Sequence, residues 1–252
     1  MKSGTASGTR RGSKRLVERH ATHQITAMEN LLEASGVHAG ADFYGLIERF
    51  DAPIWWTAHG NRLFTTPEMS IAALQQHPGV AAPSGAIVRI YGDDPRLAVL
   101  MLWGVGSTVM IGPETSLPGA TLACGTGGAI TIDGDLSAAE GATLNARNGG
   151  TIHVGRGGLW SSDVRLLTDD MHAIRDRETG ERVNLRGGSV RVDEQVWLGQ
   201  GSLLLPGATI GRETVIGARS VVTGSLPAYA VCAGVPARVL RTGTTWTHED
   251  AD

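Results

Sequence analysis

The feature that most constrains this chain is a six-residue period in its C-terminal part. An aliphatic residue recurs at every sixth position from residue 198 onward, as Leu198, Leu204, Ile210, Ile216 and Val222. This spacing fits neither the 3.6-residue period of a helix nor the two-residue period of a half-buried strand. It predicts a solenoid in which each flat side takes six residues and points its aliphatic side chain inward.

Small residues and glycines keep the same phase. A small residue stands four positions after each of the first four aliphatic residues, as Ser202, Ala208, Thr214 and Ser220. Glycine directly follows three of the aliphatic residues, as Gly199, Gly211 and Gly217. Small residues fit the narrow part of a coil wall, and glycines fit its turns. The pattern therefore predicts the corners of the solenoid as well as its interior.

Looser repeats extend the solenoid upstream, for example around Ile111 and Val154, so we expect it to occupy residues 84–241. The polar stretch 169–189 lacks the period and is dense in Arg, Asp, Glu and Gly. An insertion thrown out from a regular solenoid is a typical place for function.

Residues outside the repeat read differently. Residues 1–20 are expected to be a flexible basic tail, 21–83 a helical N-terminal cap, and 242–252 a C-terminal tail. Three helices are predicted in the cap, with apolar faces at Ile25–Leu32, Phe43–Phe50 and Ile71–Leu74; the third has Thr66 as N-cap and Pro67 at its first position. Trp55 and Trp56 are read as packing of this cap rather than as a surface that binds substrate.

The composition excludes several classes of partner. The chain has 252 residues, a net charge of -3 and 5% aromatic residues, which favours a small-molecule partner over nucleic acid. It has no apolar run long enough for a membrane span and no secretory leader pattern, so we expect a cytoplasmic protein without membrane insertion. Its two cysteines, Cys124 and Cys232, stand alone in sequence and are read as buried packing residues.

The C-terminal repeats closely resemble the hexapeptide-repeat acyltransferases. The resemblance lies in Val196–Gly199, Leu204–Gly211, Val215–Thr223 and Ala233–Arg241, about 45 residues in all, and the looser repeats extend it over roughly 150. It implies an all-β solenoid, a left-handed parallel β-helix, which forms a homotrimer and binds acyl-CoA in grooves between subunits.

A second block is similar to the polysaccharide and sugar O-acetyltransferase branch of that family. It comprises Ser161–Thr168, Asp170–Ile174, Asp176 and Thr179–Asn184, and contains an Asp-x-His followed by Gly-Glu-Arg-aliphatic-Asn. The match implies an acetyltransferase that uses acetyl-CoA and no metal, with a saccharide acceptor and His172 as general base. Either Asp170 or Asp176 would fix the tautomer of the imidazole by a hydrogen bond. Because no Cys or Ser motif indicates an acyl-enzyme, direct transfer is expected.

The resemblance also implies the other site residues. Those expected to bind the coenzyme are Trp197, Gly199, Ala218, Arg219, Thr223, Arg238 and Arg241, and those expected to bind substrate are Asp176, Arg182 and Asn184. Many relatives have glycine in place of Arg219 and a phosphate-binding lysine in place of Gly224. We therefore expect Arg219 to supply the displaced positive charge.

Other functions stay open at this level. The γ-class carbonic anhydrases share the solenoid, but they need three histidines on zinc, and only His153 and His172 lie in the repeats. A non-catalytic scaffold would need no intact loop around His172. Within the acetyltransferases, an amino sugar or a small alcohol is the alternative acceptor.

Overall fold

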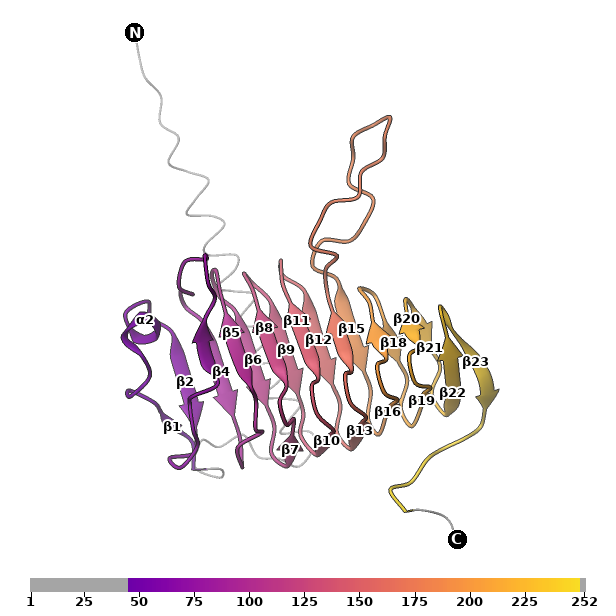
Figure 1. Ribbon diagram of the computed structural model, residues 1–252, viewed down its shortest axis with the longest axis horizontal. Coiled ribbons are helices and arrows are strands. Elements are labelled where there is room, and N and C mark those ends of the chain that lie inside the picture. Colours follow the sequence, from indigo (N-terminus) through magenta and orange to yellow (C-terminus); the bar gives the residue numbers. More distant parts are fainter. Residues whose placement is uncertain (1–44, 250–252) are drawn as a thin grey trace. The chain divides into compact units, whose positions relative to one another are not determined.

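A computed structural model of the protein describes residues 45–249, which form a parallel β-solenoid (Figure 1). From residue 108 onward the chain passes through three sheets in the same order in each coil, so successive strands of one sheet come from successive coils. The two preceding coils have strands in only two of the sheets. The left-handed parallel β-helix expected from the hexapeptide repeats is confirmed.

The first sheet has nine strands: β1 (Ile47–Glu48), β2 (Arg62–Thr65), β4 (Ile87–Ile90), β6 (Thr108–Ile111), β9 (Ala129–Ile132), β12 (Thr151–Val154), β15 (Ser189–Val192), β18 (Thr209–Ile210) and β21 (Ser225–Leu226). The second has seven: β7 (Thr115–Ser116), β10 (Leu136–Ala138), β13 (Gly158–Trp160), β16 (Trp197–Leu198), β19 (Val215–Ile216), β22 (Ala230–Gly234) and β23 (Ala237–Thr242). The third also has seven: β3 (Leu74–Gln76), β5 (Val99–Leu102), β8 (Thr121–Cys124), β11 (Thr143–Ala146), β14 (Arg165–Leu167), β17 (Leu203–Leu204) and β20 (Val221–Val222).

The six-residue pattern sets the interior. The five aliphatic residues of the repeat are each at most 1% exposed, and the four small residues that follow them are completely buried. The register stacks like on like, since Leu198 pairs with Ile216 and Leu204 with Val222. Each coil thus buries its apolar side chains against those of its two neighbours, as a solenoid requires.

Two of the three helices predicted in the N-terminal cap, those around Phe50 and around Ile71–Leu74, are wrong. Residues 47 and 48 form strand β1, and Phe50 is 82% exposed, so residues 45–50 do not make a buried helical face. Phe43 lies outside the described residues. Leu74 begins β3, which pairs with β5 in parallel, so pairing with the next coil overrides the capping signals at Thr66 and Pro67. The helix expected around Ile25–Leu32 and the tail 1–20 lie outside the described residues.

The solenoid therefore extends beyond the expected residue 84 toward the N-terminus, because β2 and β3 already pair in parallel with the coil that follows them. The helix present here is the single turn α2 (Ile54–Thr57), whose Trp56 is completely buried in the core.

The C-terminal end also departs from the expected tail. Strand β23 turns back antiparallel to β22. Beyond it, Trp246 is 6% exposed and donates a hydrogen bond from Nε1 to the Gln195 carbonyl, at 2.7 Å. In the described residues, no helix is long and apolar enough to cross a membrane.

Candidate active site

The polar insertion forms a loop that leaves the solenoid after β14, returns at β15, and projects well beyond the corner between the third and first sheets (Figure 1). Its base is closed by the buried carboxylate of Asp169. That group accepts hydrogen bonds from the backbone N–H of Met171 at 2.6 Å, of Gly187 at 3.0 Å, and from Asn148 Nδ2 at 3.0 Å. The outgoing and returning ends of the loop and the neighbouring coil therefore all bind to this one side chain.

Asp169 is held as a charged group. Burial alone would raise its pKa, but the hydrogen bonds from Asn148, Gly187 and Met171, together with Arg182, outweigh burial and lower it. The guanidinium of Arg182 lies 3.9 Å from the carboxylate. A carboxylate that accepts several N–H bonds is stabilised in its ionised form.

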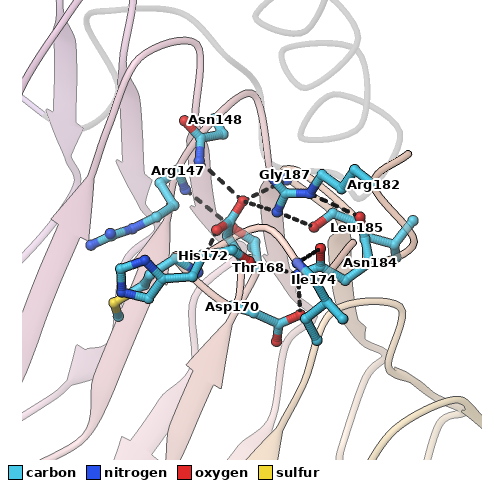
Figure 2. Close-up of polar contacts among 12 residues, drawn as sticks. Arg147, Asn148, Thr168, Asp170, His172, Ile174, Arg182, Asn184, Leu185 and Gly187 are labelled. Atoms are coloured by element: carbon cyan, nitrogen blue, oxygen red, sulfur yellow. Dashed lines mark hydrogen bonds and ion pairs between the residues drawn. The ribbon is translucent and has the colours of Figure 1, made fainter. Parts of the chain in front are cut away.

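Asn184 fixes the segment that carries His172. Its Nδ2 donates to Asp170 Oδ2 at 2.8 Å and to the His172 carbonyl at 2.9 Å, and its Oδ1 accepts from the Ile174 N–H at 2.9 Å (Figure 2). The backbone on both sides of residue 173 is therefore tied to one amide.

His172 itself is exposed. Neither ring nitrogen has a hydrogen-bond partner among residues 45–249, and the carboxylate of Asp170 meets Asn184 instead of the ring. The structure thus brings the two predicted catalytic residues into one short segment but does not join them. The ring is left available to a molecule from outside the chain.

The tip of the loop is built from its own side chains. Asp176 accepts bonds from the backbone N–H groups of Glu178 and Thr179 and from the Thr179 hydroxyl, which hold its pKa below the usual range. Arg182 donates to the carbonyls of Asn184 and Leu185, each at 3.0 Å. The three residues predicted to bind substrate, Asp176, Arg182 and Asn184, all have side chains engaged within the loop.

The second histidine of the repeats has a different environment. His153 lies on the outer face of β12, with Nε2 2.9 Å from Asp133 Oδ2 and Nδ1 3.4 Å from Arg191 Nη1. Its ring is bracketed by one acid and one arginine of adjacent coils. This arrangement agrees with the structural role predicted for it.

Four of the seven residues expected to bind the coenzyme lie at two corners of the solenoid. Gly199, Ala218 and Arg219 stand between the second and third sheets, whereas Thr223 stands at the corner that carries the loop. Within one chain, then, His172 and most of these residues occupy different corners.

Local geometry explains two of these residues independently of any ligand. A Cβ on Gly199 would stand 2.6 Å from the Ala218 nitrogen, so glycine is needed for the coils to stack. Arg219 has φ +58° and occupies a tight corner in the left-handed region, where glycine is the usual choice.

The remaining three coenzyme candidates lie on the second sheet. Trp197 is 37% exposed, and its ring centroid is 6.1 Å from that of Trp246. Arg238 and Arg241 are exposed on β23.

Sequence reasoning missed Asp169. The family motif selects its neighbour Asp170, which is exposed. The signal that could have found Asp169 is its position directly after Thr168, a completely buried small residue at a solenoid corner. A polar side chain in that place is held against the wall of the solenoid, where backbone N–H groups need acceptors.

The described residues contain no cluster of three or more His, Cys, Asp or Glu side chains that could hold a metal ion. Cys124 and Cys232 are completely buried, and burial raises the pKa of Cys124 to about 12. Neither thiol is suited to nucleophilic attack on a thioester.

Comparison with known proteins places these features in context. No family model matches the chain. A putative lipopolysaccharide biosynthesis O-acetyl transferase, WbbJ of Escherichia coli K12, is 46% identical over 99 residues, which are 36% of this chain and 50% of that protein. The galactoside O-acetyltransferase of Lactococcus lactis is 43% identical over 91 residues, 36% of this chain and 42% of that protein. The homologues of this chain are hexapeptide-repeat O-acetyltransferases.

The homology is partial, since the chain spans about half the length of the curated relatives it matches. Among solved structures, the polySia specific acetyltransferase NeuO superposes with a TM-score of 0.66 at 21% identity, over 77% of this chain and 81% of that one. That similarity shows a shared fold.

Proposed function

We propose that the protein transfers an acetyl group from acetyl-CoA to a hydroxyl of a saccharide, with His172 as general base. The observation that carries this proposal is the environment of the His172 imidazole. The ring is exposed, has no partner among the described side chains, and is carried on a backbone that Asn184 fixes, beside a solenoid homologous to O-acetyltransferases. Imidazole is the side chain best suited to accept a proton near neutral pH.

The proposed reaction is a direct transfer. A nitrogen of His172 takes the proton from the acceptor hydroxyl while the hydroxyl oxygen bonds to the thioester carbonyl carbon. The carbon–sulfur bond then breaks, and the departing thiolate takes the proton back from the imidazolium. The burial of both cysteines supports a route without a cysteinyl intermediate.

The active species is proposed to be a cytoplasmic homotrimer. His172 and the predicted coenzyme residues Gly199, Ala218 and Arg219 lie at different corners of one chain. A groove between neighbouring protomers would bring the loop of one to the corner of the next, and cyclic symmetry would give equivalent sites. Arg238 and Arg241 would then meet the coenzyme phosphates.

The test is release of free thiol from acetyl-CoA in the presence of sugars, nucleotide sugars, amino sugars and small alcohols, with the product identified by NMR. We expect an O-acetyl ester on a saccharide. A response confined to primary amines would identify an N-acetyltransferase instead. Absence of both acetyl-CoA binding and thiol release would favour a non-catalytic scaffold.

Oligomeric state is measured separately by light scattering across a range of protein concentrations. Full specific activity in a fraction that contains monomer alone would contradict the intersubunit site.

A further inference from the structure

The corner that carries the loop also carries a row of side chains that runs toward the N-terminal coils. His77 follows β3, Trp103 follows β5, Gly125 follows β8 and Arg147 follows β11, so each of four successive coils contributes one residue. We call these four residues the aromatic ledge. In the coil after Arg147, the same corner gives rise to the loop.

Trp103 lies across Gly125. A Cβ on Gly125 would stand 2.7, 2.7 and 2.8 Å from three atoms of the indole ring, so the ring presents its face to the glycine. Any other residue at position 125 would displace the tryptophan. The half-buried indole is therefore seated in a place that the backbone leaves open for it.

Arg147 is the last residue of the ledge and comes from the coil after that of Gly125. Its guanidinium carbon is 5.2 Å from the centroid of the Trp103 ring, and its Nε donates to Asn145 Oδ1 at 3.1 Å. No carboxylate within residues 45–249 forms an ion pair with Arg147, and its two terminal nitrogens donate to none of these residues. Arg49, Arg182 and Arg191, by contrast, are each paired with an aspartate.

The row of side chains beside the ledge on the third sheet carries no charge. It consists of outward residues that pair with one another from coil to coil, Gln75, Met101, Ala123 and Asn145. His77 stands at 5.3 Å from Trp103 between ring centroids, and its Nδ1 is 2.8 Å from the Pro78 carbonyl. The ledge therefore combines an aromatic ring with a positive charge that has no protein counter-ion in the described part of the chain.

Arg147 is the ledge residue in the coil that precedes the loop. In Figure 2 the side chains of Arg147 and His172 extend to the same side of the loop base, whereas Asp170 and Asn184 lie on the other side. Neighbouring strands are about 4.8 Å apart, so Trp103 stands three spacings, or about 14 Å, from the coil that bears the loop. That span exceeds one monosaccharide and requires a chain of sugar units.

We infer that the acceptor is an acidic oligosaccharide or polysaccharide segment, with one sugar ring stacked on Trp103 and a carboxylate bound by Arg147, while a hydroxyl several units away reaches His172. This inference rests on the proposed acetyl transfer. The C–H face of a sugar ring packs on the negative face of an indole, and a guanidinium fork binds a carboxylate through two parallel hydrogen bonds.

The experiment compares oligogalacturonates from monomer to hexamer with neutral maltooligosaccharides of the same lengths, measured by thiol release. For the wild type, kcat/KM rises with length in the acidic series and stays lower in the neutral one. Trp103→Ala raises KM for the galacturonate hexamer about tenfold, a loss of about 1.4 kcal/mol, and leaves KM for acetyl-CoA unchanged. Trp103→Phe retains most of the affinity, and Gly125→Ala reproduces the Trp103→Ala effect with the indole still present.

Arg147→Gln tests the charge, and it weakens the acidic hexamer while leaving the neutral one unchanged. The matched controls are Phe64→Ala and Arg89→Gln, because Arg89 lies 5.1 Å from the Phe64 ring centroid in a similar pair on the first sheet, away from the loop. Both control variants keep wild-type values for every acceptor.

Calorimetric binding of the galacturonate hexamer separates the inference from the proposed reaction. His172→Ala binds the hexamer as the wild type does but releases no thiol, whereas Trp103→Ala binds it more weakly. If wild-type turnover is independent of length and Trp103→Ala behaves as wild type, the ledge is overturned while the His172-dependent reaction stands. If no acceptor gives thiol release but the hexamer binds and Trp103→Ala weakens that binding, the ledge stands and the proposed reaction fails.

Discussion

The solenoid coils and the loop at residues 169–188 are held together in opposite ways. From β6 onward, the coils are fixed by ladders on three sides and by a row of side chains that is almost completely buried. The loop projects away from the core and is fixed at one buried carboxylate and one amide, those of Asp169 and Asn184. A disruptive substitution in a coil should therefore lower the free energy of unfolding. A disruptive substitution in the loop should lower enzymatic activity alone.

Removing the imidazole is expected to give the largest effect on the loop side of this comparison. His172→Ala should lower kcat by about 10² to 10⁴, the range typical of general-base loss, and leave the thermal unfolding midpoint unchanged. The variant His153→Ala is the control, because it removes the other histidine of the repeats and should keep most of the activity. A His172→Ala enzyme that retains most of its kcat would rule out this base.

A substitution that crowds two stacked coils should instead lower stability. Gly199→Ala places a Cβ 2.6 Å from the Ala218 nitrogen, so we expect a loss of about 3 kcal/mol in the free energy of unfolding, measured in urea. Gly224→Ala is the matched control, since nothing lies within 4 Å of a Cβ there, and it should be neutral. Equal stability of the two variants would mean that the coils can separate without cost.

Releasing the base of the loop should reduce activity without unfolding the solenoid. Asp169→Asn replaces one acceptor oxygen by a donor that faces other donors, and we expect loop amides to exchange about 30-fold faster, equivalent to about 2 kcal/mol. Amides of β16 to β20 should keep their protection. Asp170→Asn provides the comparison, because that exposed carboxylate meets Asn184 alone, and its effect should be smaller.

Acid should reproduce this release in the wild type. The pKa of Asp169 is lower in the folded protein than the value of about 3.9 expected in an unfolded chain. The contribution of this group is therefore complete above about pH 4 and is lost as the pH falls through the lowered folded value. The amide resonances of Gly187 and Met171 should shift in that window by NMR, and resonances that stay constant would contradict the assignment of charge.

The smallest expected effect concerns a corner residue that the fold already explains. Arg219→Ala should raise KM for acetyl-CoA several-fold, about 1 kcal/mol, and more so at low salt, if its side chain meets a coenzyme phosphate. A dephosphorylated analogue should show a smaller change. An unchanged KM for both would leave Arg219 with its structural role at φ +58° alone.

The part of the fold that could be predicted is the part whose interior is periodic. Between Leu198 and Val222 an aliphatic residue recurs every six residues, because each inward side chain contacts its equivalent in the next coil. The local sequence pattern is therefore enough to predict these contacts. At the other end, Leu74 and Thr66 carried helix signals, and their outcome depended on pairing between β3 and β5. That pairing joins segments far apart in sequence, which local propensity does not record.

The site divides in the same manner. The motif around His172 identified the loop and the amide of Asn184, because both lie in one contiguous block. Asp169 and the Trp103–Arg147 pair were missed, since their roles arise from coils stacked on one another: Asn148 reaches Asp169, and Gly125 makes room for Trp103. Trp103, Gly125, Arg147 and Asp169 recur once per coil, at the 22-residue separation that also relates the paired strands β5, β8 and β11, and a six-residue pattern does not mark which corner side chains meet.

The reversed strands at the two ends of the solenoid bear on self-association. A stack of parallel coils exposes at each end backbone groups that match the next coil, so separate chains could continue one another into a fibre. Strand β1 ends the first sheet antiparallel to β2, and β23 ends the second sheet antiparallel to β22. An incoming coil would meet hydrogen-bonding groups in the alternating spacing of an antiparallel edge instead of the even spacing of a parallel one. Within residues 45–249, one of the three sheets at each end is thus closed to parallel continuation, whereas the end strands β3, β7, β20 and β21 keep parallel pairing.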